Sequence, residues 1–197
     1  MTSQQTVKKI SYDKTLSCVY AKGGARPKPA ITFGNRTLRE GADYTLSYKN
    51  NKSAGGNNSA SVTINGKGSF KGKITIPFTI NQQDLSKMTL VSCDKVYSNK
   101  AGTYKITPKL IDLDGKLLSA GKDFDKSSIT YSYEEDTDLG DGSVKKAGEP
   151  VADTDTIPAG TQIRVTLNSG NGNNYTGTFT GAYRIVQADI KSAKISI

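Results

Sequence analysis

The chain has 197 residues, of which 35% are hydrophobic, and it contains neither His nor Trp. Without His it cannot hold the Ser–His–Asp or Cys–His nucleophile systems of many hydrolases. Its net charge of +9 is uneven, because residues 1–80 carry 13 Lys and Arg against 3 Asp and Glu, whereas residues 81–197 carry 14 against 15. The basic first part indicates either an anionic partner, such as a teichoic acid or sulfated glycan, or a Lys-rich solvated surface. The basic residues are scattered singly, so we expect no nucleic-acid partner.

Alternating hydrophobic residues predict half-buried β-strands along the chain. Residues 44–48, 60–64 and 74–78 each place apolar or aromatic side chains on one face, and the pattern returns at 129–133 and 163–167. Turns rich in Gly and Asn separate these runs, and strong helical patterns are missing. Short alternating strands with frequent turns predict an all-β, antiparallel sandwich or barrel.

Two short motifs occur twice and reveal an internal repeat. The string Leu-x-x-Gly-x-Asp-aromatic occupies residues 38–44 and again residues 118–124. A Gly-x-Gly motif followed by an aromatic residue begins at Gly66 and again at Gly170. We expect the glycines to permit tight turns, and the repeated Asp to accept backbone N–H groups there.

The connector after the first copy also returns, because residues 80–85 resemble residues 185–190. The repeat therefore predicts two tandem modules, residues 1–84 and residues 85–190. The last segment, residues 191–197, resembles the first strand of a third module, as expected for a monomer within a longer array.

The second copy carries about 24 extra residues, which we place at about 134–158. Residues 131–133 on one side and Val144 on the other predict a long hairpin that projects from the sandwich. Insertions on repeat scaffolds are commonly loops on one face, and loops often carry function. The candidate ligand surface is therefore formed by four residues around the start of the insertion: Tyr131, Tyr133, Glu134 and Glu135.

The insertion begins with acidic residues that resemble a calcium loop. Its candidate metal ligands are Asp136, Asp138 and Asp141, named the acidic loop below. The pattern departs from an EF-hand, since no Glu closes it and no flanking helices are evident. A solvated acidic hairpin is the alternative interpretation, and we expect no metal and no cofactor.

Cys18 and Cys93 stand one in each copy, near the predicted first strands. Tandem packing seldom brings first strands together, so we expect two buried free thiols rather than a disulfide. No stretch has the length of a membrane span, and no apolar run follows the first four residues, so we expect neither a spanning segment nor a signal peptide here.

The motifs together resemble a known family. The string Leu-x-x-Gly-x-Asp-Tyr-x-Leu-x-Tyr-x-Asn-Asn (residues 38–51), the Gly-x-Gly-x-Phe-x-Gly motif from Gly66 and the closing Phe-x-Ile at Phe78 are similar to Ig-like β-sandwich repeats of surface proteins from Gram-positive, often gut-dwelling bacteria. The second copy matches at both ends but departs at the insertion. The resemblance implies two tandem Ig-like antiparallel β-sandwich domains, displayed outside the cell. It implies no catalytic or ligand-binding residues.

The sequence therefore predicts a non-enzymatic, secreted module of a bacterial cell-surface protein that acts as a stalk or spacer. A first alternative is an adhesin domain that binds host or cell-wall glycans or matrix protein through the insertion. A second alternative is an accessory segment of a surface hydrolase. In each case a signal and an anchor would lie outside this sequence.

Overall fold

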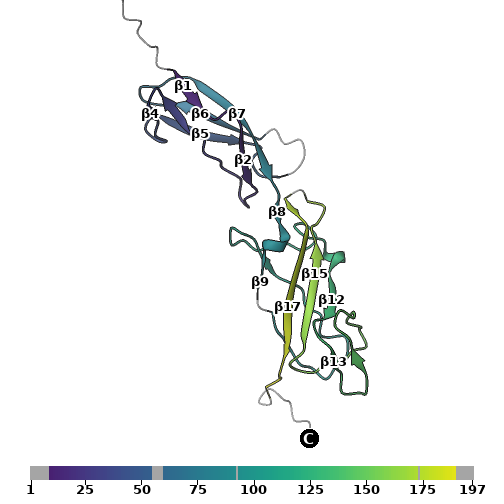
Figure 1. Ribbon diagram of the computed structural model, residues 1–197. Helices are drawn as coiled ribbons and strands as arrows, with labels where there is room; N and C mark the ends of the chain where they lie inside the picture. The colour runs from purple at the N-terminus through teal and green to yellow at the C-terminus, as the bar shows by residue number, and fades with distance from the viewer. Residues whose placement is uncertain (1–8, 55–59, 92, 173, 190–197) are drawn as a thin grey trace, which may run out of the picture. The chain divides into compact units, whose positions relative to one another are not determined.

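The computed structural model describes residues 9–54, 60–91, 93–172 and 174–189 (Figure 1). Its strands form several sheets, and the helical elements among these residues are two single 3-10 turns, η1 (Leu85–Lys87) and η2 (Lys126–Ser128). The predicted all-β class is confirmed, and the arrangement is consistent with a β-sandwich. The predicted first strand of a third module, residues 191–197, lies outside the described residues.

The chain divides between Gln83 and Asp84 into two compact units, called unit 1 and unit 2. Unit 1 contains a four-stranded sheet in the order β2 (Leu16–Val19), β7 (Lys73–Asn81), β6 (Ser61–Gly66), β5 (Tyr44–Lys49). It also contains a smaller sheet in the order β1 (Ile10–Tyr12), β3 (Ile31–Phe33), β4 (Arg36–Thr37). The pair β2–β7 is parallel, whereas the other pairs of these two sheets are antiparallel. The short strand β8 (Gln83–Asp84) spans the division between the units.

Because side chains alternate along the strands, one face of the larger sheet packs into the core of unit 1. Val62 of β6 lies opposite Ile76 of β7, and both side chains are buried. The next rung faces outward, where the hydroxyl oxygens of Thr63 and Thr75 are 3.0 Å apart. Because successive side chains of a strand point to opposite faces, hydrophobic and hydroxyl-bearing rungs alternate across the sheet.

Unit 2 repeats the larger sheet in the order β10 (Lys95–Val96), β17 (Thr178–Val186), β15 (Gln162–Asn168), β12 (Thr130–Tyr133). The pair β10–β17 is parallel, as β2–β7 is in unit 1. Two short antiparallel pairs accompany this sheet: β9 (Thr89–Leu90) with β11 (Leu110–Ile111), and β13 (Thr137–Asp138) with β14 (Val144–Lys145). The strand β16 (Tyr175–Thr176) precedes β17.

Equivalent hydrogen bonds in the two units match the sequence repeat. The N–H of Tyr20 donates to the carbonyl oxygen of Asn81 at 2.8 Å, and the N–H of Tyr97 donates to that of Val186 at 2.8 Å. Both bonds continue the parallel pair between the first and last strands of the larger sheet. The two copies of the sequence motif therefore build the same framework.

The repeated glycines stand where the backbone leaves no room for a side chain. A Cβ atom at Gly66 would lie 2.8 Å from the carbonyl oxygen of Phe70, and one at Gly170 would lie 3.0 Å from that of Lys122. These distances are shorter than ordinary van der Waals contacts, so another residue would displace the backbone. The predicted turn role of these glycines is confirmed.

Both cysteines are free and partly buried. The expected free thiols are confirmed, whereas the expected burial is only partial. Cys18 lies on β2, which is an edge strand of the larger sheet within the described part of unit 1. Burial raises the pKa of both thiols above the ordinary value.

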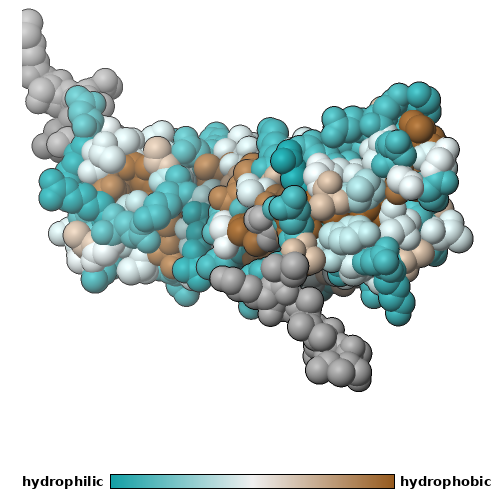
Figure 2. Space-filling view, turned by 90° about the horizontal axis from the view of Figure 1, so that it is seen from below, coloured by the Kyte–Doolittle hydropathy of each residue, from teal (hydrophilic) through white to brown (hydrophobic). Residues whose placement is uncertain are grey.

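Large exposed hydrophobic side chains come from four separate parts of the chain: Val19, Val96, the pair Leu113 and Leu117, and Val144. On the visible face of Figure 2, hydrophobic residues form separate brown areas between hydrophilic ones. Scattered exposed hydrophobic residues are normal on protein surfaces.

Candidate functional site

The insertion of unit 2 folds back onto the larger sheet. The N–H of Tyr133 donates to the carbonyl oxygen of Glu149 at 3.0 Å, and the N–H of Val151 donates to that of Tyr131 at 3.0 Å. Residues 149–151 therefore extend the sheet beyond its edge strand β12. The predicted long hairpin is present, because the pairing of β13 with β14 continues through these bonds to residues 131 and 151, but its base belongs to the sheet and does not project from it. The second half of the insertion packs against unit 2 because it carries apolar residues that are buried.

Tyr133 belongs to the core of unit 2 and not to a ligand surface. Its side chain is 0% exposed, and its hydroxyl donates to Oδ2 of Asp155 at 2.9 Å. Asp155 is itself buried, and its Oδ2 also accepts the N–H of Ala152 at 2.8 Å. Burial, with a smaller contribution from the bond to Asp155, raises the pKa of Tyr133 well above its usual range. A ligand outside the protein cannot reach this ring.

Tyr131 also points inward, since its position alternates with that of the outward-facing Ser132. Its hydroxyl donates to the carbonyl oxygen of Ile106, and its ring stands edge-to-face against Tyr183 with 6.4 Å between the ring centroids. Burial raises the pKa of Tyr131. The predicted aromatic ligand surface is therefore not formed, because the register of β12 against β15 directs both tyrosines toward the core.

The two glutamates of the predicted ligand surface have different surroundings. Glu134 receives two hydrogen bonds from the guanidinium of Arg164, at 2.8 Å from Nε and 2.9 Å from Nη2. This hydrogen bonding lowers the pKa of Glu134. Glu135 is exposed, whereas Glu134 is partly exposed.

The carboxylates of the acidic loop bind groups of their own hairpin. Asp136 pairs with Lys146 at 2.7 Å, Asp138 accepts the N–H of Gly140 at 2.8 Å, and Asp141 accepts the N–H of Ser143 at 2.9 Å. Among the residues that the structure describes, no three Asp, Glu, Cys or His side chains are grouped to hold a metal ion. The geometry fits the alternative interpretation, in which these residues shape a solvated acidic hairpin.

The repeated Asp fixes a turn in each unit. The carboxylate of Asp43 accepts the N–H of Arg39 at 2.9 Å, and that of Asp123 accepts the N–H of Ser119 at 2.8 Å. Asp43 also receives Nη2 of Arg36 at 2.8 Å. Both Asp side chains are buried. The predicted role of this Asp, which is to accept a backbone N–H in the turn, is confirmed.

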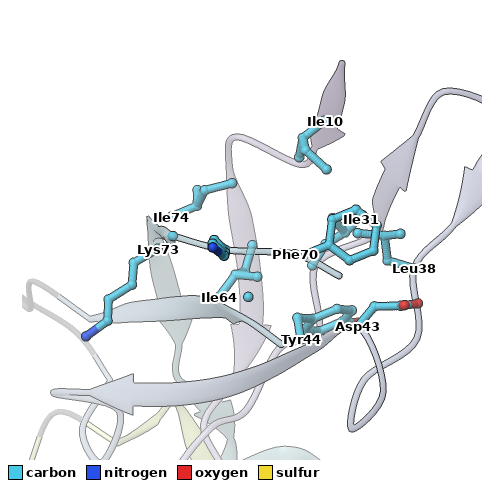
Figure 3. Close-up of a pocket in the computed structure, with 12 residues that line it drawn as sticks. Ile10, Ile31, Leu38, Asp43, Tyr44, Ile64, Phe70, Lys73 and Ile74 are labelled. Carbon is cyan, nitrogen blue, oxygen red and sulfur yellow. The ribbon is translucent and has the colours of Figure 1, made fainter. Parts of the chain in front are cut away.

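Unit 1 contains an apolar pocket of about 190 Å³ near the start of β7. Figure 3 shows side chains such as Ile10, Ile64 and Ile74 around it, while the amine of Lys73 and the carboxylate of Asp43 point away from them. A pocket with a mainly apolar lining suits an apolar group.

Sequence reasoning did not find Asp155, the buried partner of the Tyr133 hydroxyl. It lies 22 residues from Tyr133, in a Thr- and Asp-rich stretch that reads as loop. Only the folding of the insertion brings its carboxylate under the sheet. Lys145 supports it, with Nζ 3.5 Å from Oδ1.

Comparison with known proteins gave no assignment: no protein-family description matches the chain, and no curated protein matches it. Among the described residues, no helix has the length and apolar character needed to cross a membrane.

Proposed function

We propose that the chain is a non-catalytic stalk or spacer segment of a bacterial cell-surface protein, built from two Ig-like β-sandwich modules. The motif resemblance supports the Ig-like assignment and the extracellular location. The repeated framework and the turn-forming role of the motif residues support a structural rather than a catalytic purpose.

One observation carries the proposal: each unit closes its larger sheet by pairing the first strand in parallel with the last, β2 with β7 and β10 with β17. In a parallel pair, the start of one strand and the end of the other lie at opposite ends. Tension between the two ends of a unit then acts along the strands and loads their hydrogen bonds together rather than one after another. This geometry suits a module that must stay folded while it is pulled.

The adhesin alternative loses the aromatic contact surface on which it depended. Tyr133 is buried and Tyr131 is committed to Ile106 and Tyr183, so the insertion presents mainly charged hairpin residues. The stalk is therefore the function that the geometry supports best.

Force spectroscopy on the chain, held by handles at its two ends, tests the proposal. Because the N–H of Tyr20 faces β7, alternation places the N–H of Cys18 toward β7 and that of Ser17 toward the open edge. Proline lacks this N–H, so Cys18→Pro removes a hydrogen bond from the parallel pair whereas Ser17→Pro spares it.

We expect Cys18→Pro to lower the unfolding force of unit 1, Ser17→Pro to leave it nearly unchanged, and unit 2 to serve as the internal reference. Equal unfolding forces for both variants and the unaltered chain would show that the parallel pair does not bear the load. That result would remove the main support for a stalk.

A further inference from the structure

The edge of β5 in unit 1 borders a shallow basic groove. Two hollows, of about 440 and 530 Å³, lie along it and share Tyr48 and Asn51 in their walls. Four cations line them, from the segment before β3, the end of β5 and the turn after β5: Arg26, Lys28, Lys49 and Lys52.

A single carboxylate, that of Glu40, lines the same hollows, and it pairs with Lys28 at 2.9 Å. The positive charge of the groove therefore exceeds its negative charge, in keeping with the +10 balance of residues 1–80. Arg26, Lys49 and Lys52 are all exposed. Their guanidinium and ammonium groups are therefore accessible to a ligand in solvent.

The groove is held in shape by hydrogen bonds across it. The hydroxyl of Tyr48 donates to the carbonyl oxygen of Pro27 at 3.1 Å. The side-chain amide of Asn51 donates to the carbonyl oxygen of Ala25 at 2.9 Å, and the N–H of Ala25 donates back to the carbonyl oxygen of Asn51 at 2.8 Å. The two basic segments are therefore fixed relative to each other around a half-buried aromatic ring.

Unit 2 lacks this feature at the equivalent edge. There residues 149–151 of the insertion pair with β12 and cover the edge that corresponds to the edge of β5. The part of the chain from residue 81 onward also has slightly more acidic than basic residues. The basic groove thus belongs to one unit and is not a consequence of the shared fold.

We propose that this groove binds an anionic polysaccharide, that is, a chain of sugars bearing sulfate or carboxylate groups. Shallow, open hollows suit a chain that lies along the surface better than a small molecule that must be enclosed. Spaced, exposed cations match the repeated anionic groups of such a chain. This activity is additional to the stalk and does not depend on it.

Binding of a fluorescent heparin-derived octasaccharide to the whole chain tests the proposal, measured by anisotropy at low and moderate salt. The groove variant is Arg26→Ala with Lys52→Ala. The matched control is Lys14→Ala with Lys71→Ala, which removes the same charge from exposed positions of unit 1 that do not line the groove. A neutral maltooligosaccharide and a single-stranded DNA of similar charge complete the set.

We expect the groove variant to lose about fivefold in affinity for each cation removed, at the upper end for exposed ion pairs, and the control to lose much less. Binding should weaken as salt rises, and the neutral sugar should not bind. Equal losses of affinity in the groove and control variants would show that binding depends on overall charge and not on the groove, and would overturn the proposal. Absence of octasaccharide binding, or DNA binding that depends equally on Arg26 and Lys52, would overturn it as well.

Discussion

Replacing Ile157 by alanine distinguishes an insertion that is part of the core from one that projects into solvent. The side chain of Ile157 is 0% exposed, although it lies within the 134–158 insertion. Truncating a buried Ile to Ala typically costs about 2–5 kcal/mol, from lost burial and from the cavity that remains. A substitution in an exposed loop changes the free energy of unfolding by only about 0.5 kcal/mol or less.

Urea denaturation followed by circular dichroism and Tyr fluorescence measures this difference. With a slope of about 2 kcal/mol per M, the Ile157→Ala change should lower the midpoint of unit 2 by roughly 1–2.5 M. Val144→Ala is the matched control, because Val144 lies in the same insertion but is 54% exposed. Ile76→Ala, in the core of unit 1, identifies which transition belongs to which unit. A midpoint shift for Ile157→Ala no larger than that for Val144→Ala would refute the conclusion that the insertion is packed.

Three further predictions concern the turn carboxylates, the surface ion pair and the acidic loop. Asp43→Ala and Asp123→Ala should each destabilise their own unit by about 1–3 kcal/mol, because a backbone N–H loses its acceptor, and thermal unfolding should show no effect on the other unit. Since Arg164 lowers the pKa of Glu134, the stabilisation by this pair is present above the ordinary Glu pKa of 4.5 and is lost as pH falls through the lower folded-state value. Glu134→Gln should therefore reduce the fall in the free energy of unfolding of unit 2 at acid pH. The change should be well under about 1 kcal/mol, because the pair is partly exposed. Millimolar Ca²⁺ should leave the Tm of unit 2 unchanged, whereas a rise with Ca²⁺ concentration would indicate a site in the acidic loop.

Much of the local structure of unit 1 follows from its sequence. The alternation of residues 60–64 and 74–78 predicts which faces of β6 and β7 are buried, because a strand has a period of two residues. The predicted roles of Gly66 and Asp43 also hold, since a close backbone approach and a turn that needs an acceptor restrict the residue types locally.

The insertion shows where this reasoning fails. The same alternation puts Tyr131 and Tyr133 on one face but does not say which face is inside. That depends on the register of β12 against β15, on the strand pairing of residues 149–151, and on the burial of Asp155 beneath Tyr133. These contacts are long-range, so a polar stretch that resembles a projecting loop becomes part of the core.

The basic groove likewise depends on contacts that the sequence does not reveal. The sequence by itself determined the all-β class, the repeat, the turn residues and the excess of positive charge in residues 1–80, because each depends on composition or on neighbours along the chain. It did not determine where that charge gathers. Only the tertiary structure brings Arg26 and Lys28 beside Lys49 and Lys52, because hydrogen bonds join the segment before β3 to the end of β5 and the turn that follows it.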